Sequence, residues 1–453
     1  MLAPMGGPHL SGSAGGVWSH DQAPAAPLGI LTKSCKASTP SEVNTDADSA
    51  LKRVRKWARQ SAAKNIVGGR LNTCCRNLIP QRENVDVWKS GNQTFSYGGL
   101  MVCGSVWTCP VCASKITEKR RSELAQALEA VKENGGSALL LTLTVPHYAH
   151  HRVETVLGGL TDAYRRMTNR AGFGRFTSAV GCFGRVRTLE VTYGPNGWHP
   201  HFHVLLFTDK PTSKRSLAAW SADLLKQWQS ACVKSGLPMP NSHGLSLDDG
   251  SRAAAYASKW GMDHEMTKGH LKTGKTNDHL SPFALLDLHL DRQSADSDFQ
   301  RSIAPQAGAL FFMYAQAFKG RRQLVWSAGL RDLLDLAPEK SDEELAETHD
   351  QDATLFAKIP LDTWRQVLRH DKRGELLEIC RQGLSALEKW LEDLKLLGGL
   401  QARPFAPKDT GSAATVGPLT LGQGRRDTTG CAVTPRCGQT DSAHKRDFQN
   451  PDG

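Results

Sequence analysis

The sequence predicts an α+β fold in which an antiparallel sheet is flanked by helices. Two segments with strand character, 186–194 and 197–207, are joined by Gly-Pro-Asn-Gly at 194–197, which is typical of a hairpin turn. Segments with the helical spacing of apolar residues stand before and after this pair. Because paired strands alternate with helices, we expect the helices to cover one face of the sheet.

The composition favours a polyanionic partner. Of the 453 residues, 56 are lysine or arginine and 45 are aspartate or glutamate, so the net charge is +11. No stretch reaches the roughly 20 consecutive apolar residues of a membrane span, and no charged stretch followed by an apolar run marks an export signal. We therefore expect a cytoplasmic protein without a membrane partner.

Changes in composition divide the chain. Residues 1–50 and 403–453 are rich in small and polar residues without apolar periodicity, which predicts disordered tails. Between the tails we expect an N-terminal region, a central domain and a helical C-terminal region, at residues 51–137, 138–337 and 338–402. An apolar stripe between Leu376 and Leu394 could pack on the central domain or on a second copy of the chain, as in a homodimer.

The elements of the central domain follow in order. A helix at 116–134 is indicated by apolar residues on one face and ends at Gly135 and Gly136. A buried strand at 138–147 has Leu139, Leu141 and Leu143 on one side and is stopped by Pro146. We further expect helices at 153–170, 217–236 and 251–261, and a strand at 243–249.

The cysteines indicate a structural zinc site. Their odd number, eleven, and the lack of an export signal argue for reduced thiols. Cys109 and Cys112 form a C-P-x-C knuckle shortly after Cys103, and zinc takes four such ligands in a tetrahedron. We expect Cys75 as the fourth ligand, with Cys74 as the alternative. Buried cysteines that bind no ion are the other interpretation.

Three histidines alternate along one predicted strand. Residues at i, i+2 and i+4 of a strand share a face, so His199, His201 and His203 should project together. The neighbouring strand contributes Glu190. A carboxylate beside neutral imidazoles suits Mg²⁺, Mn²⁺ or Zn²⁺ and leaves coordination positions open. The pattern therefore predicts a catalytic metal site, and a packing role for all three histidines is the weaker interpretation.

These residues resemble a known family. The His201-Phe202-His203 triplet is similar to the metal motif of the HUH endonucleases, and the surrounding segment resembles the rolling-circle plasmid replication initiators. Three segments are similar to the landmarks of that family in order: LLLTLTVP at 139–146, GWHPHFH at 197–203 and AAAYASKWG at 253–261. With the cysteine knuckle and a basic segment at 317–331, the resemblance covers roughly residues 70–335. It implies an HUH nuclease-like fold for the central domain.

The resemblance also implies a reaction. Tyr256 would attack one phosphodiester of plasmid origin DNA, single-stranded or in an extruded hairpin, and leave a 5′-phosphotyrosine and a free 3′-hydroxyl primer. Lys259, one helical turn later, would assist the phenol or hold a phosphate oxygen. His201, His203 and Glu190 would hold Mg²⁺ or Mn²⁺, with His199 as a fourth ligand or as the partner of a ligand. A host helicase and DNA polymerase are the implied partners.

The chain departs from the family at one position. Related initiators carry a glutamate one helical turn before the tyrosine, whereas this chain has Arg252. The group that acts in termination is therefore open, and Asp248, Asp249 and Asp263 are candidates.

Two basic segments are candidates for DNA contact. Lys319, Arg321 and Arg322 lie close to Trp326, which could stack on a base, and residues 52–56 form a second basic run. Solvated surface is the alternative for both. Two other functions remain open: a single-tyrosine mobilisation relaxase or transposase, and a zinc-stabilised DNA-binding protein without catalysis. A catalytic role of Tyr256 would exclude the last of these.

Overall fold

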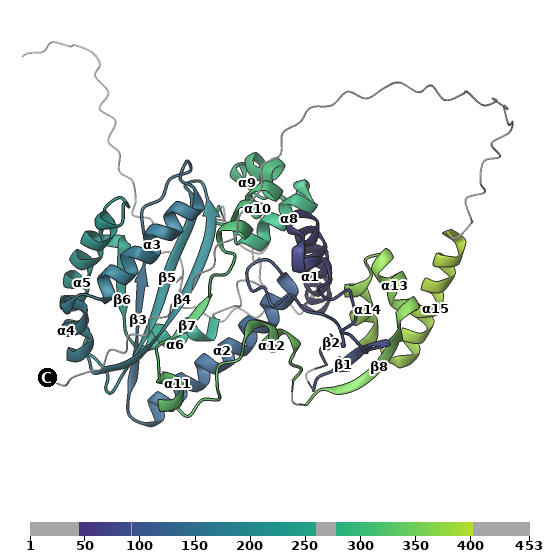
Figure 1. The fold of residues 1–453 in the computed structure, drawn as a ribbon, viewed down its shortest axis with the longest axis horizontal. Helices are drawn as coiled ribbons and strands as arrows, with labels where there is room; N and C mark the ends of the chain where they lie inside the picture. The colour runs from purple at the N-terminus through teal and green to yellow at the C-terminus, as the bar shows by residue number, and fades with distance from the viewer. Residues whose placement is uncertain (1–44, 92, 260–277, 351, 402–453) are drawn as a thin grey trace, which may run out of the picture. The chain divides into compact units, whose positions relative to one another are not determined.

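The computed structural model describes residues 45–91, 93–259, 278–350 and 352–401, all within one compact unit (Figure 1). The tail predicted at 403–453 lies outside the described residues, and so does most of the tail predicted at 1–50. Helix α1, Thr45–Val67, begins inside that first predicted tail. No helix in the described part of the chain is long and apolar enough to cross a membrane.

The larger sheet has five antiparallel strands in the order β6-β3-β5-β4-β7. Its strands are β3 (Ser137–Leu143), β4 (Cys182–Gly194), β5 (Gly197–Thr208), β6 (Leu245–Asp248) and β7 (Leu324–Trp326). The predicted hairpin is confirmed, because β4 and β5 pair along their whole length, with Glu190 opposite His201. Strand β4 begins earlier than predicted, and β7 lies in a segment for which we expected no strand.

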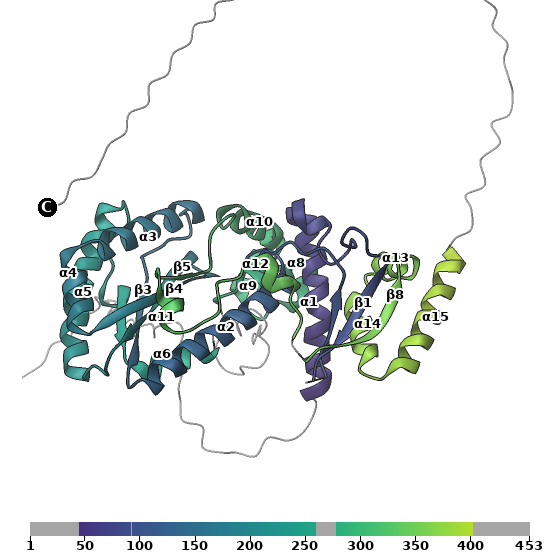
Figure 2. The ribbon, with the colours of Figure 1, turned by 60° about the horizontal axis from the view of Figure 1, so that its bottom comes forward.

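Helices cover both faces of this sheet, so the expectation of one covered face is wrong (Figures 1 and 2). One face is covered by α3 (Val153–Thr168), α4 (Ala171–Ala179) and α5 (Lys214–Lys234), and the other by α2 (Pro110–Glu133), α6 (Gly250–Lys259) and α11 (Leu330–Leu333). The reason lies in the central strands. Leu139 and Leu141 of β3 enter one core while Leu140 enters the other, so both faces need a cover.

A second, three-stranded sheet joins distant parts of the chain. It has the order β2-β1-β8, and its strands are β1 (Asn84–Lys89), β2 (Phe95–Gly98) and β8 (Thr354–Pro360). The prediction that residues 338–402 are entirely helical is therefore wrong at β8. This short segment becomes a strand because β1 offers it a full set of backbone partners, from Asn84 opposite Pro360 to Lys89 opposite Thr354.

The remaining helices follow α6 in the chain. They are α8 (Pro282–Leu290), α9 (Asp298–Ile303), α10 (Ala307–Ala317), α12 (Asp342–Glu347), α13 (Leu361–Arg369), α14 (Arg373–Cys380) and α15 (Leu384–Gln401), with short 3₁₀ turns at Gly69–Asn72, Ser242–Gly244, Arg292–Ser294 and Ala304–Gln306. Helix α1 packs against α2, α8, α10 and α14. The α14 part of the predicted C-terminal stripe packs on α1, where Leu376 shares a core with Trp57, and the α15 part packs on α13 and α14.

Two arginines of the basic run at 52–56 form ion pairs with the helices that pack on α1. Arg55 pairs with Asp287 of α8 at 2.8 Å, and Arg53 pairs with Glu378 of α14. Arg59, one turn later, pairs with the same Asp287 at 2.6 Å, with both groups buried. The ion pairs of Arg53 and Arg55 hold α1 against its neighbours, so the structure gives no support to a DNA-binding role for the run.

Candidate active site

The hairpin of β4 and β5 builds the site. Thr188, Glu190 and Thr192 of β4 stand opposite His203, His201 and His199 of β5, so all six side chains share one face. The three histidines are 7–9% exposed. The predicted alternation of the histidine strand is confirmed.

Glu190, His201 and His203 form a group that could hold a metal ion. Oε2 of Glu190 lies 3.5 Å from Nε2 of His201 and 3.6 Å from Nε2 of His203. An ion with bonds of about 2.1 Å keeps neighbouring ligand atoms roughly 3.0–3.4 Å apart, so these atoms need to move little to share one. The donor set and its spacing fit a divalent cation.

Neighbouring groups orient both imidazoles. Nδ1 of His201 lies 3.2 Å from the backbone carbonyl of His199, an acceptor, so Nδ1 is the donor and Nε2 is turned toward Glu190. Nδ1 of His203 lies 2.9 Å from Oγ1 of Thr142 on β3. Both Nε2 atoms therefore face Glu190, which is the arrangement that metal-ligating histidines need.

Burial and charge set the protonation of the group. Burial lowers the pKa of His203 to about 4, although the charge of Glu190 acts in the opposite direction. Burial raises the pKa of Glu190, but the charges and hydrogen bonds of His203, His201 and Tyr256 outweigh it, and the pKa falls below its ordinary value. At neutral pH the site thus presents a carboxylate and a neutral His203, the forms that bind a cation.

Tyr256 of α6 lies directly against this group. Its hydroxyl donates a hydrogen bond of 2.6 Å to Oε1 of Glu190 and lies 2.5 Å from Oγ1 of Thr188. The ring centroids of Tyr256 and His203 are 4.5 Å apart. The helix comes this close because Ala253 and Ala257, both fully buried, let it pack on β3 and α2.

The other residues predicted around the tyrosine are placed only in part. Lys259 ends α6, but its side chain lies outside the described residues, and so does Asp263. Asp249 caps α6, because its Oδ1 accepts a hydrogen bond of 3.1 Å from the backbone N–H of Ser251. Asp248 stands in β6 opposite Leu140.

His199 lies outside the group of three, and this corrects its assignment as a ligand. Its Nδ1 lies 3.1 Å from Nδ1 of His147, and its ring centroid is 5.1 Å from that of His201. Burial, followed by the neighbouring imidazoles, lowers the pKa of His199 to about 2. His199 instead supports His201 through its backbone carbonyl, the second of the two predicted roles.

Four cysteines form a separate group, made of Cys74, Cys103, Cys109 and Cys112, all buried. Sγ of Cys74 lies 3.5 Å from that of Cys112 and 3.7 Å from that of Cys109. A disulfide needs about 2.05 Å, whereas a tetrahedron of thiolates at about 2.3 Å from zinc has its sulfurs roughly 3.8 Å apart. The spacing therefore fits a zinc ion.

The structure places Cys74, not Cys75, in this group, so the preferred fourth ligand was wrong. Cys75 has a left-handed backbone with φ of 52°, and its N–H donates to the carbonyl of Met101 at 2.8 Å. Sγ of Cys75 lies 3.9 Å from that of Cys74, so it borders the group without belonging to it. Spacing alone could not distinguish the two, because they are neighbours in the chain.

The basic residues predicted to contact DNA precede β7. Lys319 is exposed, Arg321 is half-buried and Arg322 pairs with Glu339 at 2.6 Å. The carbonyl of Gln323 accepts a hydrogen bond of 2.8 Å from the N–H of Leu189, so this segment runs along the sheet beside the site. Trp326 is buried below Arg331, at 5.0 Å, so it is not placed to stack on a base.

Three side chains around the site were not predicted from the sequence. Thr142, Thr188 and His147 each contact a predicted residue. The two threonines could have been found from the strand register, which places Thr188 and Thr142 on either side of His203.

Comparison with known proteins finds relatives of the segment that carries the site. Residues 101–228 match the family model described as replication protein, a segment that holds Cys103, Glu190 and the paired histidines. This segment is therefore similar to the replication-protein family. It is similar to "Protein rep" of Streptomyces lividans, at 27% identity over 337 residues, which are 60% of this chain and 73% of the relative.

A second relative matches a shorter part of the chain. The chain is similar to "Neomycin resistance protein" of Streptomyces cyanogenus, at 28% identity over 170 residues, which are 30% of this chain and 39% of that protein. No solved structure matches the chain. The Rep matches indicate a plasmid replication initiator, as the sequence motifs predicted.

Proposed function

We propose that this protein starts rolling-circle plasmid replication by cutting one strand of origin DNA, with Tyr256 as the nucleophile. One observation carries the proposal: the Tyr256 hydroxyl contacts Oε1 of Glu190 at 2.6 Å, while Oε2 of the same carboxylate faces the two imidazoles. A nucleophile and a cation-binding group thus meet at one carboxylate, which is what attack on a phosphodiester requires.

The reaction is a transesterification. The phenolic oxygen of Tyr256 bonds to phosphorus, and the bond from phosphorus to the 3′ oxygen breaks. The phenol proton passes to Oε1 of Glu190, and the departing 3′ oxygen takes a proton from the solvent to become the free primer hydroxyl. The phosphate stays on the 5′ end of the cut strand as a phosphotyrosine, so no bond energy is lost to water.

Glu190, His201 and His203 would hold Mg²⁺ or Mn²⁺, which supplies a Lewis acid for the nonbridging phosphate oxygens. Thr142 and the carbonyl of His199 keep the imidazoles aimed at that position. Lys259 remains part of the proposal as a cation for a phosphate oxygen. The antiparallel sheet with this site on its central hairpin supports an HUH nuclease-like fold for the domain.

The proposal extends to the partners. Origin DNA, single-stranded or in an extruded hairpin, would contact Lys319, Arg321 and Arg322 beside the site. Cys74, Cys103, Cys109 and Cys112 would hold a structural Zn²⁺. A host helicase and DNA polymerase would use the released 3′ end in the cytoplasm.

Covalent capture tests the proposal. The protein is incubated with single-stranded origin DNA labelled at its 3′ end and with Mn²⁺, and the labelled adduct is resolved under denaturing conditions. We expect an adduct that maps to Tyr256 and disappears in Tyr256→Phe. Tyr193→Phe, which changes a half-buried tyrosine of β4, is the matched control and should keep the adduct. An adduct that persists in Tyr256→Phe would refute the mechanism.

A further inference from the structure

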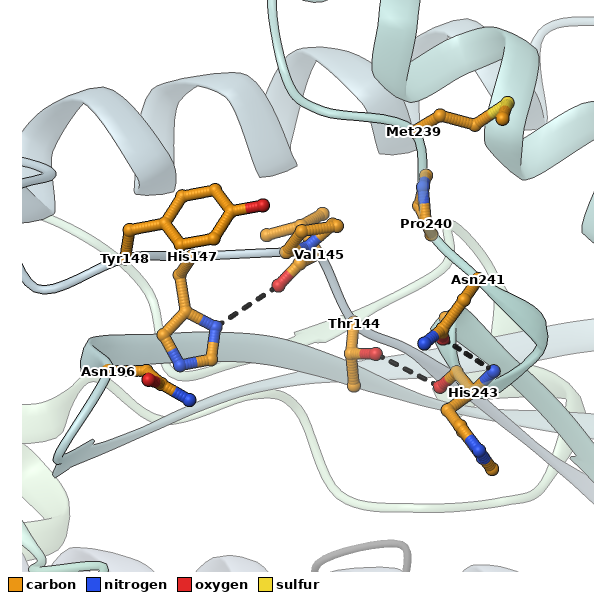
Figure 3. A pocket seen from close by; sticks show the side chains of 11 residues that line it. Thr144, Val145, His147, Tyr148, Asn196, Met239, Pro240, Asn241 and His243 are labelled. Carbon is orange, nitrogen blue, oxygen red and sulfur yellow. Dashed lines mark hydrogen bonds between the residues drawn. The ribbon is translucent and has the colours of Figure 1, made fainter. Parts of the chain in front are cut away.

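A pocket of about 360 Å³ opens beside the candidate active site, where the chain leaves β3 and where it approaches β6 (Figure 3). Figure 3 shows His147, Tyr148 and Asn196 on one side of it and Met239, Asn241 and His243 on the other. Nothing in the mechanism above uses this space. Its volume lies in the range of pockets that bind small ligands, about 300–1,000 Å³.

The lining of the pocket combines apolar surfaces with polar edges. No aspartate, glutamate, lysine or arginine is among the described residues that line it. Tyr148 is 49% exposed and Met239 65% exposed, so a ring and a thioether are open to a ligand. Oδ1 of Asn241 accepts a hydrogen bond of 2.9 Å from the N–H of His243, which leaves the side-chain amide nitrogen as a donor.

A continuous row of rings connects the pocket to the metal-binding group. His147 lines the pocket, and its ring centroid lies 4.5 Å from that of His199. The ring of His199 lies 5.1 Å from that of His201. A group bound in the pocket would therefore sit two ring contacts from the position proposed for the scissile phosphate.

We propose that the pocket binds one unpaired base of the DNA strand next to the cut phosphodiester, an inference that rests on the proposed function. The apolar faces of a base match Tyr148 and Met239. Its polar edge matches the side-chain amides of Asn196 and Asn241. Because no lysine or arginine is among the described lining residues, the pocket suits a base better than a phosphate. The pocket would fix the register of the strand, so that one phosphodiester is presented to Tyr256.

A binding experiment tests the pocket without relying on cleavage. In the Tyr256→Phe protein, 2-aminopurine is placed at successive positions of a single-stranded origin oligonucleotide, and its fluorescence reports stacking. We expect quenching at one position next to the cut site, and loss of that quenching when Tyr148→Ala is added. Phe183→Ala removes an exposed aromatic ring at the opposite end of β4 and should leave the quenching unchanged.

A cleavage experiment tests the consequence for register. Three changes should each slow adduct formation about tenfold, the size of one lost stacking contact. They are an abasic site at that position of the DNA, Tyr148→Ala and Asn241→Ala. The effects of the abasic site and of Tyr148→Ala on the adduct rate should not be additive, because both changes remove the same contact. Additive effects, or wild-type rates in both variants, would overturn the inference.

The two experiments separate the proposals. If no adduct forms but the quenching depends on Tyr148, the pocket stands and the proposed reaction fails. If the adduct forms at Tyr256 but no position shows Tyr148-dependent quenching, the reaction stands and the pocket inference is overturned. Competition by a micromolar deoxynucleoside monophosphate would assign the pocket to a free nucleotide and would also overturn it.

Discussion

The carboxylate of Glu190 contacts both the paired imidazoles and the tyrosine of the site. One oxygen faces the Nε2 atoms of His201 and His203, and the other accepts the hydrogen bond of Tyr256. The depressed pKa of Glu190 keeps it charged at neutral pH, so it can bind a cation, and its contact with the Tyr256 hydroxyl places it to accept the phenol proton. The two functions should therefore respond differently to substitution at Glu190 and at Tyr256.

We predict that Glu190→Gln lowers both cation affinity and adduct formation, the latter by about 100-fold or more, the range expected when a base in proton transfer is lost. Tyr256→Phe should abolish the adduct but keep cation affinity, because the phenol is not a ligand. Mn²⁺ titration followed by spin resonance measures the affinity. Equal Mn²⁺ affinities in Glu190→Gln and the unaltered protein would contradict the assignment.

The adjacent cysteines allow a second comparison at this scale. Cys74→Ser should lower the zinc content and the thermal stability, because it removes one sulfur of a buried tetrahedron. Cys75→Ser changes the neighbouring residue outside the cluster and should keep zinc. Metal analysis of the purified proteins measures both, and zinc loss in Cys75→Ser alone would reverse the assignment.

At the scale of elements, helix α6 depends on small residues. Ala253 and Ala257 lie one turn apart against Leu140 and Leu205 of the sheet, and both are buried. Their methyl groups set the distance between the helix and the sheet, and with it the position of the Tyr256 hydroxyl.

We predict that Ala257→Leu destabilises the protein by about 1–3 kcal/mol through overpacking. It should also slow adduct formation by more than the loss of folded protein accounts for. Ala254→Leu, on the exposed side of the same helix, is the control. Urea unfolding and the adduct assay are run on both. An adduct rate unchanged in Ala257→Leu would show that Tyr256 does not depend on the helix position.

The segment from α12 to β8 ties α2 to the smaller sheet. Arg120 of α2 pairs with Asp342 at 2.5 Å, and Lys119 pairs with Asp350 at 2.6 Å. His349 stacks on Trp88 of β1, with ring centroids 5.0 Å apart. Burial, and then the charge of Lys115, lowers the pKa of His349 to about 4.

This shift makes stability depend on pH. Between about pH 6.5 and pH 4 the unfolded chain binds a proton at His349 that the folded chain does not, so stability falls as the pH falls through this window and is fully present above it. We predict that His349→Gln reduces this dependence. Urea midpoints at about pH 7 and pH 5 measure it, and an equal slope in the variant and the unaltered protein would contradict the prediction.

At the scale of the whole molecule, the second sheet makes the N-terminal and C-terminal regions one structure. Strand β8 pairs with β1, and α14 packs on α1. The boundary predicted at 337/338 therefore runs through a shared core that contains Val85, Ile359 and Leu376.

We predict that ending the chain after residue 337 destabilises it strongly, because β1 loses its partner β8 and α1 loses α14. A chain ending after residue 402 keeps all of these contacts and is the control. Thermal unfolding and zinc content compare the two. Equal melting temperatures would support the boundary predicted from the sequence.

The sequence by itself determined what depends on local pattern. The alternation of His199, His201 and His203, the hairpin at Gly194–Gly197 and the C-P-x-C knuckle follow from backbone geometry over a few residues, so they could be predicted. Tertiary structure alone decided which of two neighbouring cysteines joins the cluster, that Thr354–Pro360 becomes a strand, and that Tyr256 meets Glu190. These outcomes depend on contacts between distant segments, whose free energy no local pattern contains.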